Sequence, residues 1–177
     1  VIRVTQAVLP AMRKQKHGMI VNVSSIAGRV GFPATSAYIG SKFALEGLSE
    51  SMRYELEPFG IRVVVVEPGA IRSNFINAMA LAEKASDPNS PYAQLMQKVG
   101  AGLKLLLEHG TPSEEVAKTI LKAVTSENPE PRYLVGNDAA MLMEARKKMS
   151  DTEFEQFMKK ESVGSAARGV TTTGEII

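Results

Sequence analysis

The segment Met19-Ile-Val-Asn-Val23 is a short apolar run that only Asn22 interrupts, and a second run, Ile61-Arg-Val-Val-Val-Val66, is rich in β-branched residues. Both runs have the length and composition of strands that are buried on both faces of a sheet. Between them, a loop rich in Gly, Ser and Pro (24–36) leads into a helical stretch, 38–59. A strand, a helical crossover and a second strand form the repeating unit of a parallel sheet. The segment therefore predicts an α/β fold.

The same pattern continues on both sides of this segment. An amphipathic helix is expected at 1–16, with Gly18 as its left-handed end, and residues 75–110 are mostly helical. Thr111 is a cap candidate for a helix that reaches about Ser126. The remaining expected elements are a third strand at 132–135 and helices at 139–148 and 151–160. Together they predict about three parallel strands with flanking helices.

We expect one domain at residues 1–160, followed by a flexible tail at 161–177. A helical pattern is already under way at Val1, without Met or a capping residue. No Gly-rich phosphate-binding turn follows any expected strand. We therefore interpret the chain as the C-terminal part of a Rossmann-like, doubly wound parallel sheet whose N-terminal Gly-rich half is absent.

Composition argues against several classes of function. The chain has 44% hydrophobic and 23% charged residues, and its net charge of +2 is spread without a basic block for nucleic acid or anionic membranes. Cysteine is absent, and His17 and His109 are too few for a metal cluster and are assigned no catalytic role. No apolar run reaches the ~20 residues that span a bilayer. Without a signal-peptide pattern, a cytoplasmic location is expected.

The candidate chemistry lies in Ser25, Tyr38 and Lys42. Tyr38 and Lys42 are four residues apart at a helix start and share one face, while Ser25 follows a strand end, where open α/β sheets bind ligands. A free phenol is too weak an acid to act as a base at neutral pH, but an adjacent ammonium stabilises the phenolate. The spacing alone fits an exposed tyrosine beside a solvated lysine about equally well.

The motifs together resemble the short-chain dehydrogenase/reductase family. In that family, a strand ends in Asn-x-Ser-Ser, Tyr-x-x-x-Lys follows, and a later strand ends in Pro-Gly; here Ser25 lies thirteen residues before Tyr38, and Pro68-Gly69 follows the second strand. The resemblance implies that Tyr38 is the catalytic acid/base and that Ser25 binds and polarises the substrate. Lys42 would hold the nicotinamide ribose and promote ionisation of Tyr38.

The resemblance also implies a cofactor, NAD or NADP, in the turn after the second strand. By residue type alone, Pro68 and Gly69 fit an ordinary strand-ending turn. In the family, the backbone near Gly69 and Ile71 and the hydroxyl of Ser73, where Thr is more common, contact the nicotinamide carboxamide. Because the Gly-rich turn is missing, we expect residues 1–177 alone to bind the cofactor weakly.

The resemblance implies an NAD(P)-dependent oxidoreductase that interconverts an alcohol and a ketone or aldehyde. Residues 75–110 would form the substrate-binding insertion, and their apolar side chains favour an apolar substrate, although a helix-pair core explains them too. These side chains are Phe75, Ile76, Met79, Leu81, Tyr92, Leu95, Met96, Leu103 and Leu106. The amino-acid sequence around Tyr54 and around Arg132 is similar to that of hydroxysteroid- and retinol-dehydrogenase-like members of the family.

The family pairs two of these helices between subunits, which implies a homodimer or homotetramer through residues 1–16 and 38–59. A row of Ala44, Leu48, Met52 and Leu56 must be buried, either in a partner or within its own subunit. The alternative function is that of a catalytically incompetent fragment or oligomerisation module of such an enzyme, which lacks the dinucleotide-binding half.

Overall fold

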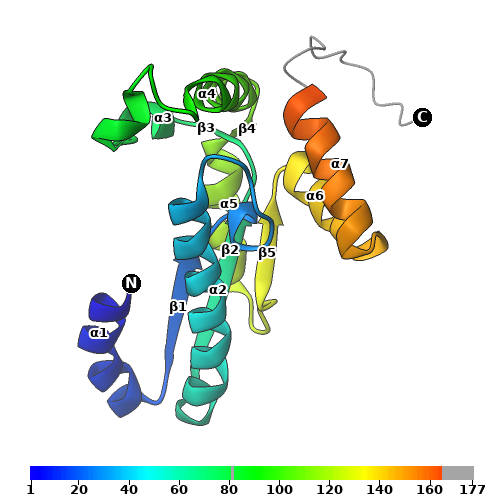
Figure 1. Cartoon of the computed structure of the whole chain (residues 1–177). Helices are drawn as coiled ribbons and strands as arrows, with labels where there is room; N and C mark the ends of the chain where they lie inside the picture. The colour runs from blue at the N-terminus through cyan, green and yellow to red at the C-terminus, as the bar shows by residue number, and fades with distance from the viewer. Residues whose placement is uncertain (81, 165–177) are drawn as a thin grey trace.

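The computed structural model describes residues 1–80 and 82–164. Its centre is a three-stranded sheet in the order β1 (Gly18–Val23), β2 (Ile61–Pro68) and β5 (Arg132–Val135) (Figure 1). Both pairings are parallel. Strand β1 pairs with β2 along its whole length, beginning with Gly18 opposite Ile61, and β5 pairs with the other edge of β2 from Val65 onward. The predicted parallel α/β sheet is confirmed.

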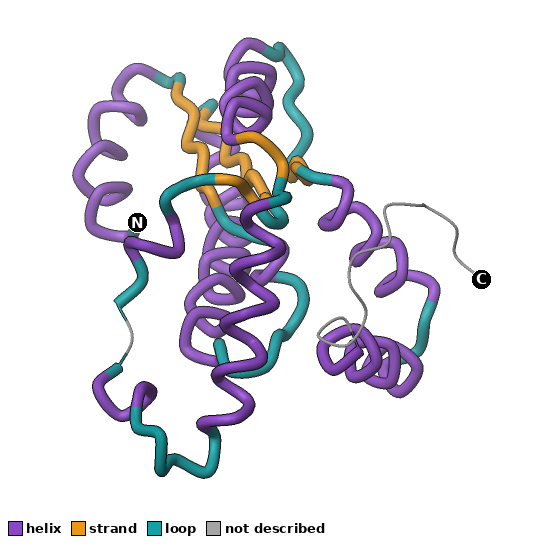
Figure 2. The backbone as a smooth tube through the Cα atoms, turned by 90° about the horizontal axis from the view of Figure 1, so that it is seen from above, coloured by secondary structure: helices purple, strands orange, loops and turns teal. Residues whose placement is uncertain are grey.

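Helices cover both faces of this sheet. Helix α2 (Ser36–Leu56) lies in front of the strands in Figure 1 and α5 (Ser113–Thr125) lies behind them. Helix α1 (Ile2–Gln15) flanks β1, while α6 (Asn137–Lys148) and α7 (Asp151–Gly164) form a pair on the side of β5. Figure 2, seen from above, shows the strands enclosed between helices. The shorter elements and α4 are η1 (Ile26–Gly28), η2 (Glu57–Phe59), β3 (Ile71–Arg72), α3 (Phe75–Ala78), η3 (Glu83–Ser86), α4 (Ala93–Glu108) and β4 (Thr111–Pro112).

Strand β2 is the centre of the core, because its residues from Val63 to Val66 are at most 2% exposed. One apolar cluster joins β2 to α2 through Met52 and Leu56, with Leu9 and Met12 of α1 packed against it. A second cluster joins the loop after β1 to α6 and α7. Half of the predicted apolar row of α2 is therefore buried within its own subunit, whereas Ala44 is exposed.

Three predictions about local structure were wrong. The left-handed residue that ends α1 is Lys16 (φ 54°) and not Gly18, which opens β1 where a Cβ would lie 2.8 Å from Met12 Sδ. Strand β1 is not buried on both faces, because its residues from Met19 to Val21 are only partly buried and Val23 is 46% exposed. Thr111 does not cap α5; it pairs with Ile71 in a small parallel sheet.

The second strand also differs from its prediction, since β2 continues through Glu67 to Pro68. Glu67 is 1% exposed although it is charged. The predicted tail at 161–177 overlaps the end of α7, and residues 165–177 of it lie outside the described residues. Among the residues that the structure describes, no helix has the length and apolar character to cross a membrane.

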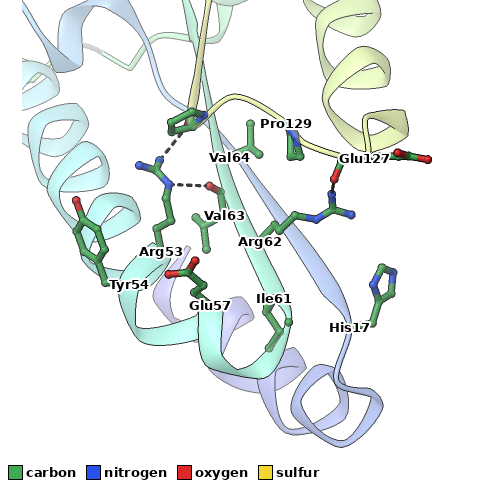
Figure 3. Close-up of a pocket in the computed structure, with 12 residues that line it drawn as sticks. His17, Arg53, Tyr54, Glu57, Ile61, Arg62, Val63, Val64, Glu127 and Pro129 are labelled. Atoms are coloured by element: carbon green, nitrogen blue, oxygen red, sulfur yellow. Dashed lines mark hydrogen bonds between the residues drawn. The ribbon is translucent and has the colours of Figure 1, made fainter.

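A groove lies at the amino ends of the strands, between α2, β2 and the segment that precedes β5 (Figure 3). Its two arginines are engaged by backbone carbonyls. Arg53 donates to Val63 O (3.2 Å) and Pro131 O (3.0 Å), and Arg62 donates to Glu127 O (2.6 Å). The Arg53 side chain thus joins Val63 of β2 to Pro131, whose carbonyl also accepts from Val65 N (3.0 Å), at the point where β5 begins to pair with β2.

Candidate active site

Ser25 lies just beyond the carboxyl end of β1, with its backbone extended (φ −169°, ψ 161°). Its Oγ accepts a hydrogen bond from Ala27 N (3.1 Å) and so caps η1. The same hydroxyl donates to Pro68 O at the end of β2 (3.3 Å). The structure therefore brings Ser25 and Pro68 together, 43 residues apart in the sequence, at one edge of the sheet.

Tyr38 and Lys42 occupy the first turns of α2, above the same edge. Lys42 Nζ donates to Val23 O (3.1 Å), the last carbonyl of β1, and lies 5.7 Å from the centroid of the Tyr38 ring. The Tyr38 hydroxyl has no hydrogen-bond partner among the described residues, so it is available to a ligand. Lys42 thus anchors the start of α2 to the strand that leads to Ser25.

The Lys42 ammonium is subject to two opposing influences. Burial lowers its pKa, and the charge of Glu46, one helical turn further along α2, raises it. The net direction is a lowered pKa.

The turn after β2 is held by backbone and side-chain hydrogen bonds. Gly69 N donates to Val135 O (2.8 Å), Ala70 N donates to Asp138 Oδ2 (2.7 Å), and Ala70 O accepts from Thr111 N (2.9 Å). A Cβ at Gly69 would collide with the Asp138 carboxylate. Close approach of this carboxylate is thus a second reason, besides the turn itself, for glycine at this position.

The rest of the turn is more open. Ile71 belongs to β3 and is partly buried, and Ser73 is exposed. The Ser73 hydroxyl accepts from Phe75 N at 3.4 Å, where α3 begins. Within the described part of the chain, no hydrogen bond joins Ser73 to Ser25, Tyr38 or Lys42. The structure therefore places Ser73 on the adjoining loop and leaves its hydroxyl accessible.

The predicted substrate-binding insertion lies above the carboxyl ends of the strands, at the top of Figure 1. Phe75 of α3 contacts Tyr38, with ring centroids 6.0 Å apart. Most described members of the apolar set argue against a helix-pair core, because Tyr92 is 66% and Leu106 56% exposed and α4 has no buried residue; Met96 and Leu103 are partly buried. Leu81 and the side chain of Ile76 lie outside the described part of the structure.

Sequence reasoning missed the charged residues that support the site. Asp138 holds the Gly69 turn, and Glu46 and Glu67 are buried against Arg29 and Arg132. One signal was present: Glu67 follows four consecutive valines in a strand, and a charge at such a position needs a partner. No local pattern identified which residue the partner is.

A family model for short chain dehydrogenase matches residues 1–84, which include Ser25, Tyr38, Lys42 and the turn from Pro68 to Ser73. Two uncharacterized oxidoreductases of Schizosaccharomyces pombe are each 37% identical over 153 residues, covering 86% of this chain and 63% of each relative. The chain belongs to the short-chain dehydrogenase/reductase family. Human 17-beta-hydroxysteroid dehydrogenase type 1 is 31% identical over 135 residues, covering 75% of this chain and 41% of that protein.

The fold agrees with this membership. A short-chain dehydrogenase from Streptomyces avermitilis superposes with a TM-score of 0.69 and 34% identity, over 94% of this chain and 59% of that structure. This short-chain dehydrogenase/reductase chain thus spans less than two thirds of the length of the relatives it matches. The likeness to hydroxysteroid dehydrogenases that the motifs indicated is confirmed at the level of sequence similarity.

Proposed function

We propose that the protein is an NAD(P)-dependent oxidoreductase that interconverts an alcohol and a ketone or aldehyde. The observation that supports this most is the arrangement at the sheet edge. Lys42 contacts the ring of Tyr38 and the last carbonyl of β1, and Ser25 follows two residues later. A phenol, an ammonium group and a hydroxyl thus lie at the edge where a parallel sheet binds its ligands.

Each side chain has a distinct role in this proposal. The Tyr38 hydroxyl transfers the proton to or from the substrate oxygen, and the Lys42 charge stabilises its ionised form. Ser25 donates a hydrogen bond to the substrate oxygen and fixes this oxygen beside Tyr38. To do so, the Ser25 hydroxyl gives up its hydrogen bond to the Pro68 carbonyl and donates to the substrate instead. The bound nicotinamide cofactor supplies or accepts the hydride.

The residues present fit the nicotinamide end of such a cofactor. Gly69 leaves the turn after β2 without a side chain at the point where the backbone is closest to Asp138, and the Ser73 hydroxyl beyond it is accessible. Lys42 is half-buried next to Tyr38 and would hold the ribose. Pro68, Gly69, Ile71 and Ser73 would hold the carboxamide. NAD and NADP are equally compatible with these residues.

We infer that the substrate is apolar. Most of the described apolar side chains of the 75–110 segment are exposed above the site, and Phe75 contacts Tyr38 itself. A binding region with exposed apolar groups next to the reactive phenol favours burial of a hydrocarbon surface. The similarity to a hydroxysteroid dehydrogenase supports the same class of substrate.

The second candidate role is association with a copy of the same chain through α1 and α2, in an active enzyme or in an inactive oligomerisation module. The apolar stripe of α1 supports it, since Val4 is 68% and Ile2 56% exposed, whereas Thr5, Leu9 and Met12 face the core. On α2, Ala44 and Gly47 are exposed as well. Exposed apolar stripes of this kind mark interaction surfaces.

An assay of the full-length protein tests the enzymatic function. Steroid, retinoid and small polar alcohols are offered with NAD⁺ or NADP⁺, and formation of reduced nicotinamide is followed by absorbance. We expect turnover with at least one apolar alcohol. Absence of turnover with every substrate in either direction would favour the inactive module.

We predict that Asp138→Ala weakens cofactor binding about tenfold, because the Ala70 N–H loses its acceptor and the Gly69 turn loosens. Asp138→Asn retains an acceptor oxygen and is expected to restore most of the affinity. Titration calorimetry of the full-length protein with NAD(H) and NADP(H) measures both variants. Equal affinities in Asp138→Ala and the wild type would show that the turn is not held by this side chain.

A further inference from the structure

A cluster of buried charges lies between α2, β2 and β5, next to the site. Glu67 of β2 is 1% exposed and Glu46 of α2 is 5% exposed. Arg132 Nε lies 3.1 Å from Glu46 Oε2 and 3.3 Å from Glu67 Oε1, and Arg29 Nη1 lies 2.9 Å from Glu67 Oε1. Both buried carboxylates therefore have a guanidinium partner, as burial of charge requires.

The cluster has more acidic than basic groups. Glu50 joins it through Arg132 Nη2 (2.7 Å), so three carboxylates share the guanidinium groups of Arg29 and Arg132. Arg53 is the next cation on α2, but its guanidinium donates to the carbonyls of Val63 and Pro131 at the amino end of the sheet. Every carboxylate of the cluster is paired with a guanidinium group, but the cluster has one more acidic than basic group.

Glu46 is the member of the cluster that lies one helical turn after Lys42 on α2. Its Oε1 is buried and has no hydrogen-bond partner among the described residues, and the same is true of Ser24 Oγ. Both side chains border Gly28, where a Cβ would lie 2.8 Å from Glu46 Cγ, 2.9 Å from Ser24 Oγ and 3.0 Å from Lys42 O. The loop that bears Ser25 is therefore packed directly on the turn of α2 between Lys42 and Glu46.

A buried carboxylate oxygen without a donor is costly unless a nearby positive charge compensates it. Lys42, one turn earlier on the same face of α2, supplies a second positive charge besides Arg132. Its Nζ donates to Val23 O and forms no direct ion pair with Glu46 among the described residues, so its effect on Glu46 acts at longer range. The compensation is mutual: burial lowers the pKa of Lys42, and the charge of Glu46 raises it. Burial and the charge of Glu46 also raise the pKa of Glu67.

We propose that Glu46 is a positioning residue for the reaction, and that its carboxylate keeps the Lys42 side chain cationic beside Tyr38. This inference rests on the proposed function, in which the Lys42 charge stabilises the Tyr38 phenolate. Without the Glu46 charge, burial of the ammonium is uncompensated and Lys42 loses its proton at a lower pH. The charged and titratable groups that face Glu46 and Lys42 are Tyr38, Glu50, Arg53, Glu67, Arg132 and Arg29.

The test follows the Lys42 titration by NMR in full-length protein that carries ¹³Cε-labelled lysine, with the signal assigned through Lys42→Met. In Glu46→Gln, we expect the Lys42 titration to move to lower pH than in the wild type. The matched control is Glu50→Gln, one turn further along α2, which also removes a partner of Arg132 and is expected to leave the titration in place. Coincident Lys42 titrations in Glu46→Gln and the wild type would overturn the proposal.

Two further measurements separate charge from packing. Glu46→Asp keeps the charge with a shorter side chain, so it is expected to retain the wild-type titration even if it unfolds more easily. If Glu46→Gln does not fold, the ¹³Cδ signal of Glu46 in the wild type shows whether its side chain is ionised. The proposal requires an ionised carboxylate at Glu46 at neutral pH. A neutral carboxylic acid at this position would refute it. These titrations need no turnover, so their outcome is independent of whether the proposed function holds.

Discussion

Tyr38→Phe in the full-length protein is expected to lower kcat by roughly 10²- to 10⁴-fold, the usual contribution of a positioned general acid/base. The variant loses only the hydroxyl, which has no hydrogen-bond partner among the described residues. The ring contacts with Phe75 and Lys42 remain possible. Stability and cofactor affinity are therefore expected to stay close to wild type, and the loss to fall on the chemical step. Steady-state kinetics and thermal unfolding measure the two quantities.

Tyr54→Phe is the matched control for this substitution. Tyr54 lies on the same helix, is 67% exposed and borders the groove at the opposite end of the sheet. Its loss of a hydroxyl is expected to leave kcat unchanged. If Tyr38→Phe retained the turnover of Tyr54→Phe, the proton would have to come from another group and the role assigned to Tyr38 would be wrong.

Arg132→Met is expected to reduce the free energy of unfolding by about 3 kcal/mol, the scale for breaking a buried ion pair by removing one partner. The arginine side chain is 25% exposed, while those of Glu46 and Glu67 are 7% and 2% exposed. Burial alone would lower the pKa of Arg132, but hydrogen bonds to Glu50 and Glu46 raise it. Removal of the guanidinium therefore leaves two neighbouring carboxylates without their shared cation. Urea denaturation at neutral pH measures the loss.

The loss is expected to shrink as the pH falls. The pKa of Glu67 is raised in the folded state by burial and by the charge of Glu46, so protonation of Glu67 favours folding. Without Arg132 this raised pKa moves further up, so the variant recovers stability relative to the wild type as the pH falls from neutrality through the folded-state pKa of Glu67. A deficit that is constant over this range would mean that lost packing, and not unpaired charge, causes it.

Lys148→Met provides the comparison for a surface ion pair. Lys148 and Glu144 form a pair one helical turn apart, with side chains 72% and 66% exposed. Solvent screens such pairs and their side-chain entropy opposes them. The urea midpoint is therefore expected to stay close to that of the wild type.

Much of the fold followed from local pattern. The apolar runs at β1 and β2 and the helix between them were placed within a few residues, because strand length and helical periodicity are properties of consecutive residues. Errors arose where the burial of a segment depends on neighbouring elements that are distant in the sequence. The residue pattern of β1 predicted burial on both faces, but burial depends on what lies beside a strand, and β1 forms an edge.

The candidate site divides in the same way. Tyr38 and Lys42 could be placed together because four residues on a helix fix their relative direction. The supporting contacts could not be found, since Arg132 meets Glu46 across 86 residues and Ala70 meets Asp138 across 68. Such pairs depend on the order and register of strands, about which the spacing of residues along the chain carries no information.

The sequence by itself determined the α/β class, the approximate positions of the three strands and the identity of Ser25, Tyr38 and Lys42 as the candidate reactive groups. Only the tertiary structure decided that Glu46 lies buried one turn beyond Lys42, that Arg132 connects it to Glu67, and that Asp138 supports the turn at Gly69. The physical reason is that the direction of a side chain is set locally, whereas its burial and its charge partners are set by elements that meet only when the sheet assembles.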